Sequence, residues 1–276
     1  MKQVMLANGE AVPALGQGTW MMGEDRARRK GEIEALRHGF ELGMTLVDTA
    51  EMYGDGASEE LVGEAMEGRR DGIFLVSKAY PQNASRQRLP LACERSLARL
   101  GTDRIDLYLL HWRGGVPLAE TVEAMETLRS QGKIRHWGVS NLDLADMQEL
   151  MEAGGESCAT DQILYNLTRR GPEFDLLPWL QERRMPAMAY SPVEQGRLLG
   201  HAALAALSAE RGATPAQIAL AFVLRREGMI AIPKAGTLAH VVENSGALGL
   251  DLSPEDLARI DRSFPSPTRR APLDML

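Results

Sequence analysis

Short apolar runs alternate with longer amphipathic stretches along most of this chain. Each apolar run is bounded by glycine, proline or polar turn residues, which is typical of a buried strand, and each longer stretch places apolar residues at helical spacing. We predict strands at residues 14–19, 45–48, 73–77, 105–110, 134–139, 159–164, 186–189 and 229–232. We predict helices at residues 28–42, 57–66, 85–100, 117–130, 143–151, 174–183, 201–211, 214–226, 238–247 and 254–264.

Eight strand–helix units in a row predict the fold. Alternating strands and helices imply parallel pairing with right-handed crossovers, and this number of units fits a (β/α)8 TIM barrel better than an open sheet. Before the first unit, Asn8 and Gly9 separate two short apolar runs and predict an N-terminal β-hairpin. We predict that the helix at 254–264 is an extra C-terminal helix and that the tail at 265–276 is irregular. Because no linker or composition shift divides the chain, we expect one domain over residues 1–276.

Composition narrows the possible partners. The formal net charge of -7 and the absence of a basic stripe argue against a nucleic-acid partner. No apolar run has membrane-spanning length and the first residues lack a signal-peptide core, so we expect no membrane partner and a cytoplasmic location. We expect Cys93 and Cys158 to be free thiols, a disulfide being the alternative. The five histidines show no metal-ligand spacing, so we expect no metal site. We also expect the protein to be a monomer or a weak oligomer.

Seven polar side chains share a position at or near the C-terminal ends of the predicted strands: Asp48, Lys78, His111, Asn141, Gln162, Tyr190 and Lys234. In a barrel these ends converge on one face, where active sites lie. Each residue has an ordinary structural role when taken alone: an Asp can cap a turn, a Lys can snorkel, and a lone His is most often a satisfied core residue. Together, the set favours a catalytic site.

The chemistry of the set is that of a proton donor. Lys78 needs a counter-charge at that depth, which Asp48 can supply, and the ammonium would stabilise the phenolate of Tyr53 and lower its pKa. His111 can donate a hydrogen bond to the same substrate oxygen. Such a pocket polarises a carbonyl group, and the carbonyl carbon then needs a nucleophile. Since no nucleophilic serine or cysteine signature is present, hydride from a nicotinamide fits.

The chain resembles the aldo-keto reductase family. The resemblance rests on motifs that lie in order along nearly the whole chain: LGQGTW, VDTAEMYG, VSKAY, LYLLHW, KIRHWGVSNL, AYSPV and IPKAGT. Within the family the chain is similar to the short-loop bacterial reductases of methylglyoxal and other aldehydes. The resemblance implies an NADPH-dependent oxidoreductase that reduces small aldehydes or ketones to alcohols. It also implies a catalytic tetrad of Asp48, Tyr53, Lys78 and His111, with Tyr53 as proton donor, Lys78 tuning it, Asp48 holding Lys78 and His111 orienting the carbonyl.

The resemblance also implies a nicotinamide stacked on Tyr190, with its carboxamide held by Ser140, Asn141 and Gln162. The whole expected set of NADPH contacts is Gly18, Thr19, Trp20, Asp48, Ser140, Asn141, Gln162, Tyr190, Ser191, Pro192, Val193, Gln195, Ile232, Pro233, Lys234, Ala235, Gly236, Thr237, His240, Glu243 and Asn244. Three positions depart from the commoner family pattern: Ala235 replaces a Ser, His240 an Arg, and Asp161 a frequent Asn. We therefore expect a preference for NADPH over NADH that is softer than in relatives with the Arg.

The expected substrate contacts are Trp20, Met22, Tyr53, His111 and Trp112. The loop after His111 and the tail after residue 264 are short, which predicts an open, shallow pocket. Gly16-Gln17-Gly18 lacks the third glycine of a dinucleotide fingerprint, so we interpret these glycines as a tight strand exit.

Three alternatives remain from the residues. A Schiff-base aldolase would use Lys78 as nucleophile, although Asp48 would keep it charged. A non-catalytic NADPH-binding regulatory subunit would retain the same barrel. An NADP-dependent alcohol dehydrogenase would use the same site with an alcohol substrate.

Overall fold

The computed structural model describes residues 2–7 and 9–276. At the N-terminal end, β1 (Gln3–Met5) pairs antiparallel with β2 (Ala11–Pro13), which confirms the predicted hairpin. Gly9 has a left-handed φ of 87°, as its turn requires. The other half of the predicted turn, Asn8, lies outside the described residues.

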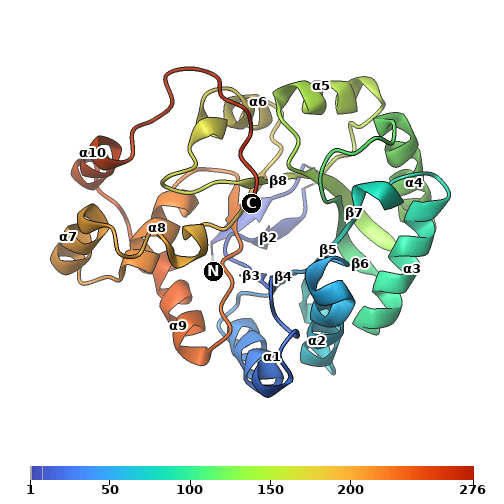
Figure 1. Ribbon diagram of the computed structural model, residues 1–276, viewed down its shortest axis with the longest axis horizontal. Coiled ribbons are helices and arrows are strands. Elements are labelled where there is room, and N and C mark those ends of the chain that lie inside the picture. The colour runs from blue at the N-terminus through green and yellow to red at the C-terminus, as the bar shows by residue number, and fades with distance from the viewer. Residues whose placement is uncertain (1, 8) are drawn as a thin grey trace.

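An eight-stranded parallel sheet forms the centre of the molecule, with the strands in sequence order (Figure 1). Parallel bridges from Leu15 to Ala231 and from Gly18 to Lys234 join the first strand to the last and close the sheet. This confirms the (β/α)8 barrel. Its strands are β3 (Gln17–Gly18), β4 (Leu46–Asp48), β5 (Phe74–Ala79), β6 (Ile105–Leu110), β7 (Ile134–Ser140), β8 (Asp161–Leu164), β9 (Ala187–Tyr190) and β10 (Met229–Ala231).

The glycines of the first strand explain how closely its neighbours approach. A Cβ on Gly16 would lie 2.6 Å from Leu46 Cδ2, and one on Gly18 would lie 2.7 Å from the carbonyl oxygen of Ile232. Both positions therefore need glycine for strand packing. This supports the tight strand exit over a dinucleotide fingerprint.

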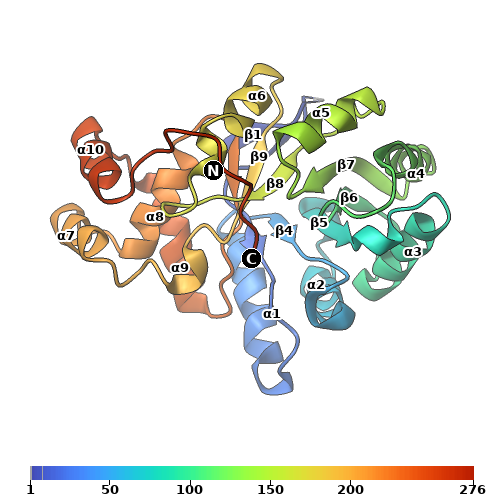
Figure 2. The ribbon, with the colours of Figure 1, turned by 45° about the horizontal axis from the view of Figure 1, so that its top comes forward.

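Helices surround the barrel (Figures 1 and 2). Their bounds are α1 (Arg26–Glu41), α2 (Ala57–Met66), α3 (Arg88–Leu100), α4 (Leu118–Ser130), α5 (Leu144–Glu152), α6 (Leu176–Glu182), α7 (Ala202–Arg211), α8 (Pro215–Leu224), α9 (Leu238–Gly246) and α10 (Pro254–Ser263). The extra helix expected near the C-terminus is α10. None of the helices in residues 2–7 and 9–276 is both long and apolar enough to cross a membrane.

Capping side chains fix where several helices begin. Asp143, Thr214 and Ser253 form capping boxes at the starts of α5, α8 and α10. The helix predicted at 174–183 is shorter than expected, because Asp175 caps its N-terminus and α6 begins only at Leu176.

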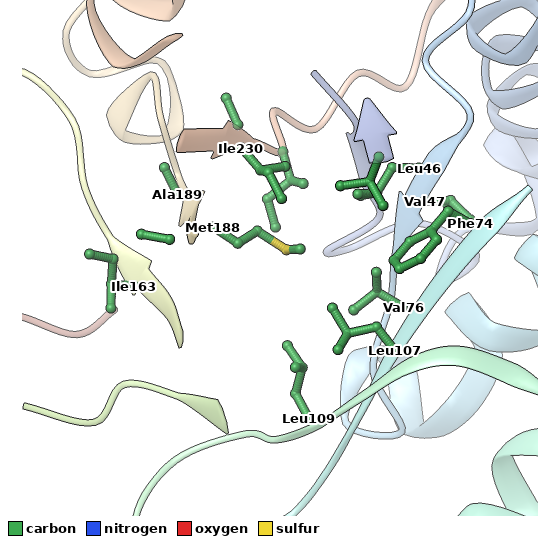
Figure 3. Packing of buried hydrophobic residues seen from close by; sticks show 14 of the residues in the cluster. Leu46, Val47, Phe74, Val76, Leu107, Leu109, Ile163, Met188, Ala189 and Ile230 are labelled. Carbon is green, nitrogen blue, oxygen red and sulfur yellow. The ribbon is translucent and has the colours of Figure 1, made fainter. Parts of the chain in front are cut away.

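The barrel interior is filled by side chains from opposite strands. Figure 3 shows Met188, Val76 and Leu107 among the side chains that point into this space. All three are 0 % exposed. Cys93 and Cys158 are also buried, and both are free thiols as expected. Because apolar side chains fill the barrel, the polar strand-end residues are confined to its rim.

Candidate active site

Lys78 is the centre of a buried hydrogen-bond network at the C-terminal end of the barrel. Its side chain is 0 % exposed, and its ammonium donates to Asp48 Oδ2 at 2.8 Å, to the carbonyl oxygen of Thr49 at 2.9 Å and to the hydroxyl of Tyr53 at 3.0 Å. Three acceptors use all three ammonium protons. Burial alone would lower the pKa of Lys78, but Asp48 and Tyr53 outweigh burial and hold this pKa above its ordinary value. The lysine therefore remains charged.

Both carboxylate oxygens of Asp48 are hydrogen-bonded. Lys78 bonds Oδ2, and Gln162 Nε2 donates to Oδ1 at 2.8 Å from the opposite side of the barrel. Burial raises the pKa of Asp48, while Lys78 and Gln162 act against that rise. The carboxylate is thus fixed in place and aimed at Lys78.

Tyr53 lies on a strained turn that brings its hydroxyl to Lys78. The 3-10 turn Tyr53–Gly56 follows β4, and its residues Gly54 and Asp55 have left-handed φ values of 57° and 51°. Burial raises the pKa of Tyr53; Lys78 lowers it, as expected, but does not outweigh burial. Tyr53 is therefore protonated at neutral pH, with a cation beside the oxygen that would lose the proton.

His111 faces Tyr53 as a neutral ring. The two ring centroids are 5.8 Å apart and the rings meet edge to face. Burial, and then the charge of Lys78, lowers the pKa of His111 to about 2. Among the described residues, Nδ1 of His111 is buried without a hydrogen-bond partner. Because a buried N–H without an acceptor is costly, we assign the proton to Nε2, which makes that nitrogen a donor.

Three side chains expected at the nicotinamide form a connected network beside the tetrad. The Tyr190 hydroxyl donates to Asn141 Oδ1 at 2.9 Å, and Asn141 Nδ2 donates to Ser140 Oγ at 3.0 Å and to the carbonyl oxygen of His111 at 3.1 Å. Ser140 Oγ donates to the main-chain oxygen of Gln162 at 2.8 Å. Asn141 adopts a left-handed φ of 60°. The structure therefore brings these residues together at the ends of β7, β8 and β9.

The segment between β10 and α9 is rich in positive charge and hydrogen-bond donors. Thr237 caps α9 by accepting a hydrogen bond from the His240 main-chain N–H at 3.3 Å, and the first turn of α9 contains no acidic residue. Lys234 is exposed and, in the part of the chain that the structure describes, forms no salt bridge. A helix N-terminus beside an unpaired ammonium is a suitable environment for a phosphate group. Asn244, expected near the adenine, is largely buried.

The loop after β9 contains a buried acid beside the expected cofactor contacts that the sequence did not predict. Glu194 is buried and accepts hydrogen bonds from Asn166, Arg169 and Arg197. Its neighbour Gln195, an expected cofactor contact, has a left-handed φ of 54°. No local pattern marked Glu194, because its three partners come from two different loops.

The C-terminal tail is the second missed feature. Figures 1 and 2 both show it returning over the middle of the barrel. Asp274 lies 3.5 Å from Arg169, and a hydrogen bond from the Leu276 main chain lowers the pKa of Tyr190, although burial raises this pKa overall. The tail therefore contacts the site at Tyr190, while the open, shallow pocket stays a prediction.

The expected substrate contacts divide into two groups. Trp20 is 43 % exposed, and Trp112 stacks at an angle on His111 with centroids 4.9 Å apart. Met22 is 0 % exposed and packs in the core, so the structure does not support it as a substrate contact. Met21, with a left-handed φ of 63°, is the exposed methionine at this position.

Asp161, one of the unusual positions, is a fully buried acid next to Gln162. Neither of its carboxyl oxygens has a hydrogen bond of ordinary geometry within the described chain, and the main chain of Leu142 provides only a contact that acts against the rise of its pKa. Burial raises the pKa of Asp161 well above its usual range. Burial therefore disfavours the charged form of Asp161. No group of three or more potential ligands among residues 2–7 and 9–276 could hold a metal ion.

Comparison with known proteins agrees with this geometry. The sequence profile of the Aldo/keto reductase family matches residues 14–264. The chain is 53% identical over 281 residues to methylglyoxal reductase YeaE of Escherichia coli (strain K12), covering 100% of this chain and 99% of that protein. It is also similar to an aldo-keto reductase from Klebsiella pneumoniae solved in complex with NADPH, with 53% identity, a TM-score of 0.98, and 100% and 99% of the two chains covered. A structure from the same organism, in complex with NADP and acetate, gives a TM-score of 0.97 at the same identity and coverage. This chain belongs to the aldo/keto reductase family.

Proposed function

We propose that this protein reduces small aldehydes and ketones, including methylglyoxal-type dicarbonyls, to alcohols with NADPH. The observation that carries the proposal is the Lys78 ammonium, bonded to Asp48 at 2.8 Å and to the Tyr53 hydroxyl at 3.0 Å, with neutral His111 beside it. The 53% identity to methylglyoxal reductase YeaE supports the substrate class. The NADPH complex of the Klebsiella pneumoniae relative supports the cofactor.

The residues present fit NADPH. Lys234 and the N-terminus of α9 offer positive charge and donors without a nearby first-turn acid, which suits a 2′-phosphate. Tyr190 and Asn141 offer an aromatic ring and an amide at the opposite end of the site. When bound, the cofactor supplies the hydride that the carbonyl carbon accepts.

Tyr53 acts as the proton donor in this proposal. It carries its proton at neutral pH and can give it to the carbonyl oxygen as that oxygen gains charge. Lys78 stabilises the phenolate left behind, since its ammonium already touches the phenol oxygen. Asp48 keeps Lys78 at this position and balances its charge.

His111 orients the substrate. As a neutral ring with the proton assigned to Nε2, it donates one hydrogen bond to the carbonyl oxygen and does not compete with Tyr53 as an acid. Trp20 and Trp112 provide apolar surface for a small substrate. Hydrogen bonds from Tyr53 and His111 then converge on a single oxygen.

The geometry disfavours the aldolase alternative. A Schiff base requires a neutral lysine, whereas Lys78 is held charged by three acceptors. Reduction and alcohol oxidation use the same groups in opposite directions, and the ratio of reduced to oxidised cofactor sets which one runs.

An activity screen tests the proposal. Purified protein is incubated with NADPH or NADH and a panel of aldehydes, ketones and dicarbonyls, and cofactor oxidation is followed by absorbance. We expect turnover of methylglyoxal with NADPH, and a loss of roughly 10²–10⁴-fold in Tyr53→Phe with unchanged NADPH affinity. NADPH binding without turnover of any panel member would instead support a regulatory subunit.

A further inference from the structure

The first turn of α2 returns beneath the strand ends that carry the tetrad. Ser58 and Glu59 are consecutive residues in this turn, and both are 0 % exposed. Buried polar groups are costly unless they are hydrogen-bonded, so their partners are informative. Neither residue contacts Tyr53, Lys78 or His111 through a hydrogen bond within the described chain.

The Ser58 hydroxyl is the middle of a directional chain of hydrogen bonds. Thr49 Oγ1 donates to Ser58 Oγ at 3.1 Å, Ser58 Oγ donates to Thr19 Oγ1 at 2.8 Å, and Thr19 Oγ1 donates to the carbonyl oxygen of Asp48 at 2.9 Å. Ser58 Oγ also lies 3.1 Å from the carbonyl oxygen of Thr19, and we assign its single proton to the nearer Thr19 Oγ1. With that assignment each hydroxyl gives one proton and accepts one, except the first, so the directions are mutually consistent. These hydrogen bonds fix the position of the Asp48 carbonyl group and of the Thr49 side chain.

The main chain at Asp48 and Thr49 also holds Lys78 in position. The carbonyl oxygen of Thr49 accepts from the Lys78 ammonium at 2.9 Å, one residue after Asp48, whose carboxylate accepts from the same ammonium. A shift of this peptide would therefore move two of the three acceptors that position Lys78. The three hydroxyls, which we call the Thr19–Thr49–Ser58 cluster, hold the peptide in place without touching the reacting atoms.

Glu59 fastens the same turn to the next strand. Its carboxylate accepts from Ser77 Oγ at 2.6 Å, immediately before Lys78 in β5, and from Arg99 Nε at 2.6 Å. Arg99 packs against Gly56, where a Cβ would lie 2.4 Å from Arg99 Cδ. The turn is thereby connected to β4 through Ser58 and to β5 through Glu59.

Tyr53 lies inside the loop that these contacts close. The loop leaves β4 after Asp48 and enters α2 at residue 57, and the bond between Thr49 and Ser58 joins its two ends. We propose that Ser58, with the hydroxyl cluster around it, is a positioning residue that holds the Tyr53 hydroxyl against the Lys78 ammonium. The inference rests on the proposed function, because it assigns Ser58 a role in the same proton transfer.

Two variants remove the cluster in different ways. Ser58→Ala deletes the central hydroxyl, and Thr49→Val deletes its donor while preserving side-chain shape. Thr121→Val is the matched control, since Thr121 in α4 is also buried, at 2 % exposed, and donates to the carbonyl oxygen of Ala84 at 3.2 Å. Within the described chain its side chain has no hydrogen bond to the candidate tetrad or to the Thr19–Thr49–Ser58 cluster. We expect kcat to fall roughly 10- to 100-fold in both cluster variants, because a proton donor displaced by a fraction of an ångström reacts more slowly. Thr121→Val is expected to keep kcat.

The pH profile of kcat separates positioning from a purely structural role. The groups that face Tyr53 are Lys78, Asp48, His111 and Tyr190. If the cluster variants loosen the contact with Lys78, the alkaline limb of the reduction profile moves to higher pH, because the phenol loses the cation that favours its ionisation. NADPH affinity, measured by fluorescence quenching, should change less than twofold.

The same experiment distinguishes this inference from the proposed function. Retained turnover in Tyr53→Phe would overturn the proton donor itself. If Tyr53→Phe is inactive but Ser58→Ala and Thr49→Val keep the kcat and pH profile of Thr121→Val, the positioning role is wrong and the function stands. If both cluster variants have a lowered melting temperature but an unchanged pH profile of kcat, the positioning role is also wrong and Ser58 has a purely structural role. We expect the double variant Ser58→Ala/Thr49→Val to lose no more activity than Ser58→Ala, because both deletions remove the same hydrogen bond.

Discussion

Replacing Lys78 by Met removes the cation on which the proton donor depends. The ammonium nitrogen lies 3.0 Å from the Tyr53 oxygen. At an effective dielectric constant of about 20, two unit charges at this distance interact with about 5.5 kcal/mol, which corresponds to a change of about four pKa units as an upper bound. Burial already raises the pKa of Tyr53, so Lys78→Met raises it further and makes the phenolate harder to form.

The expected result is a loss of kcat at neutral pH of roughly 10²–10⁴-fold, which is the usual contribution of general acid catalysis. The assay is the pH dependence of kcat for methylglyoxal reduction, with NADPH affinity measured in parallel by fluorescence. The cofactor contacts proposed at Lys234 and Tyr190 are intact in this variant, so NADPH affinity should hold. A kcat within threefold of wild type and an unmoved pH profile would refute the role assigned to Lys78.

Folding must be checked in the same variant, because Lys78→Met leaves Asp48 buried without its counter-charge. Removing one partner of a buried ion pair costs about 3–5 kcal/mol in the free energy of unfolding. The double variant Asp48→Asn/Lys78→Met removes both charges and should recover part of this loss in denaturant unfolding. It should not recover kcat, which separates the stability effect from the catalytic one.

Three further predictions concern single positions. The pKa of His111 is lowered to about 2, so its ring is neutral above about pH 3 and the kcat profile from pH 5 to 9 should show no ionisation of this imidazole. His111→Asn should reduce kcat/KM by about 10²-fold in steady-state assays, because it removes the hydrogen bond to the carbonyl oxygen. His240→Arg should tighten NADPH several-fold and leave NADH unchanged in binding titrations, because a guanidinium adds charge at the start of α9; equal tightening of both cofactors would contradict this placement of the phosphate. The pKa of Asp161 is higher in the folded protein than in the unfolded chain, so between these two pKa values the folded state binds one more proton. The free energy of unfolding therefore falls as pH rises through this range, by up to about 1.4 kcal/mol per pH unit. Asp161→Asn should remove that slope when unfolding is measured from just above the unfolded pKa of about 4 towards neutral pH.

Some features of this protein follow from the sequence alone. The alternation of apolar runs and amphipathic stretches was enough to predict the eight-stranded barrel, since strands separated by helices have few other ways to bury both faces of a parallel sheet. The same pattern placed Asp48, Lys78 and His111 at strand ends, and barrel topology brings strand ends to one face. The sequence could therefore place these three residues of the candidate tetrad together, and Tyr53 follows Asp48 by five positions in the next turn.

Other features were decided only by tertiary structure. The Gln162–Asp48 bond joins residues 114 positions apart, and the Ser58–Thr19 bond joins residues 39 apart. Sequence periodicity shows which side of an element is buried but not which distant polar group meets it, because that depends on register and on the path of each loop. For the same reason the sequence did not show that Met22 packs inward.

The balance of forces on Tyr53 also belongs to the folded state. The sequence indicated that Lys78 would lower the Tyr53 pKa, and Lys78 does act in that direction. Burial outweighs it, and burial depends on the elements packed around the turn, including α2. Residue types thus determined the kinds of chemistry available, whereas packing determined distances, protonation states and which side chains reach the site.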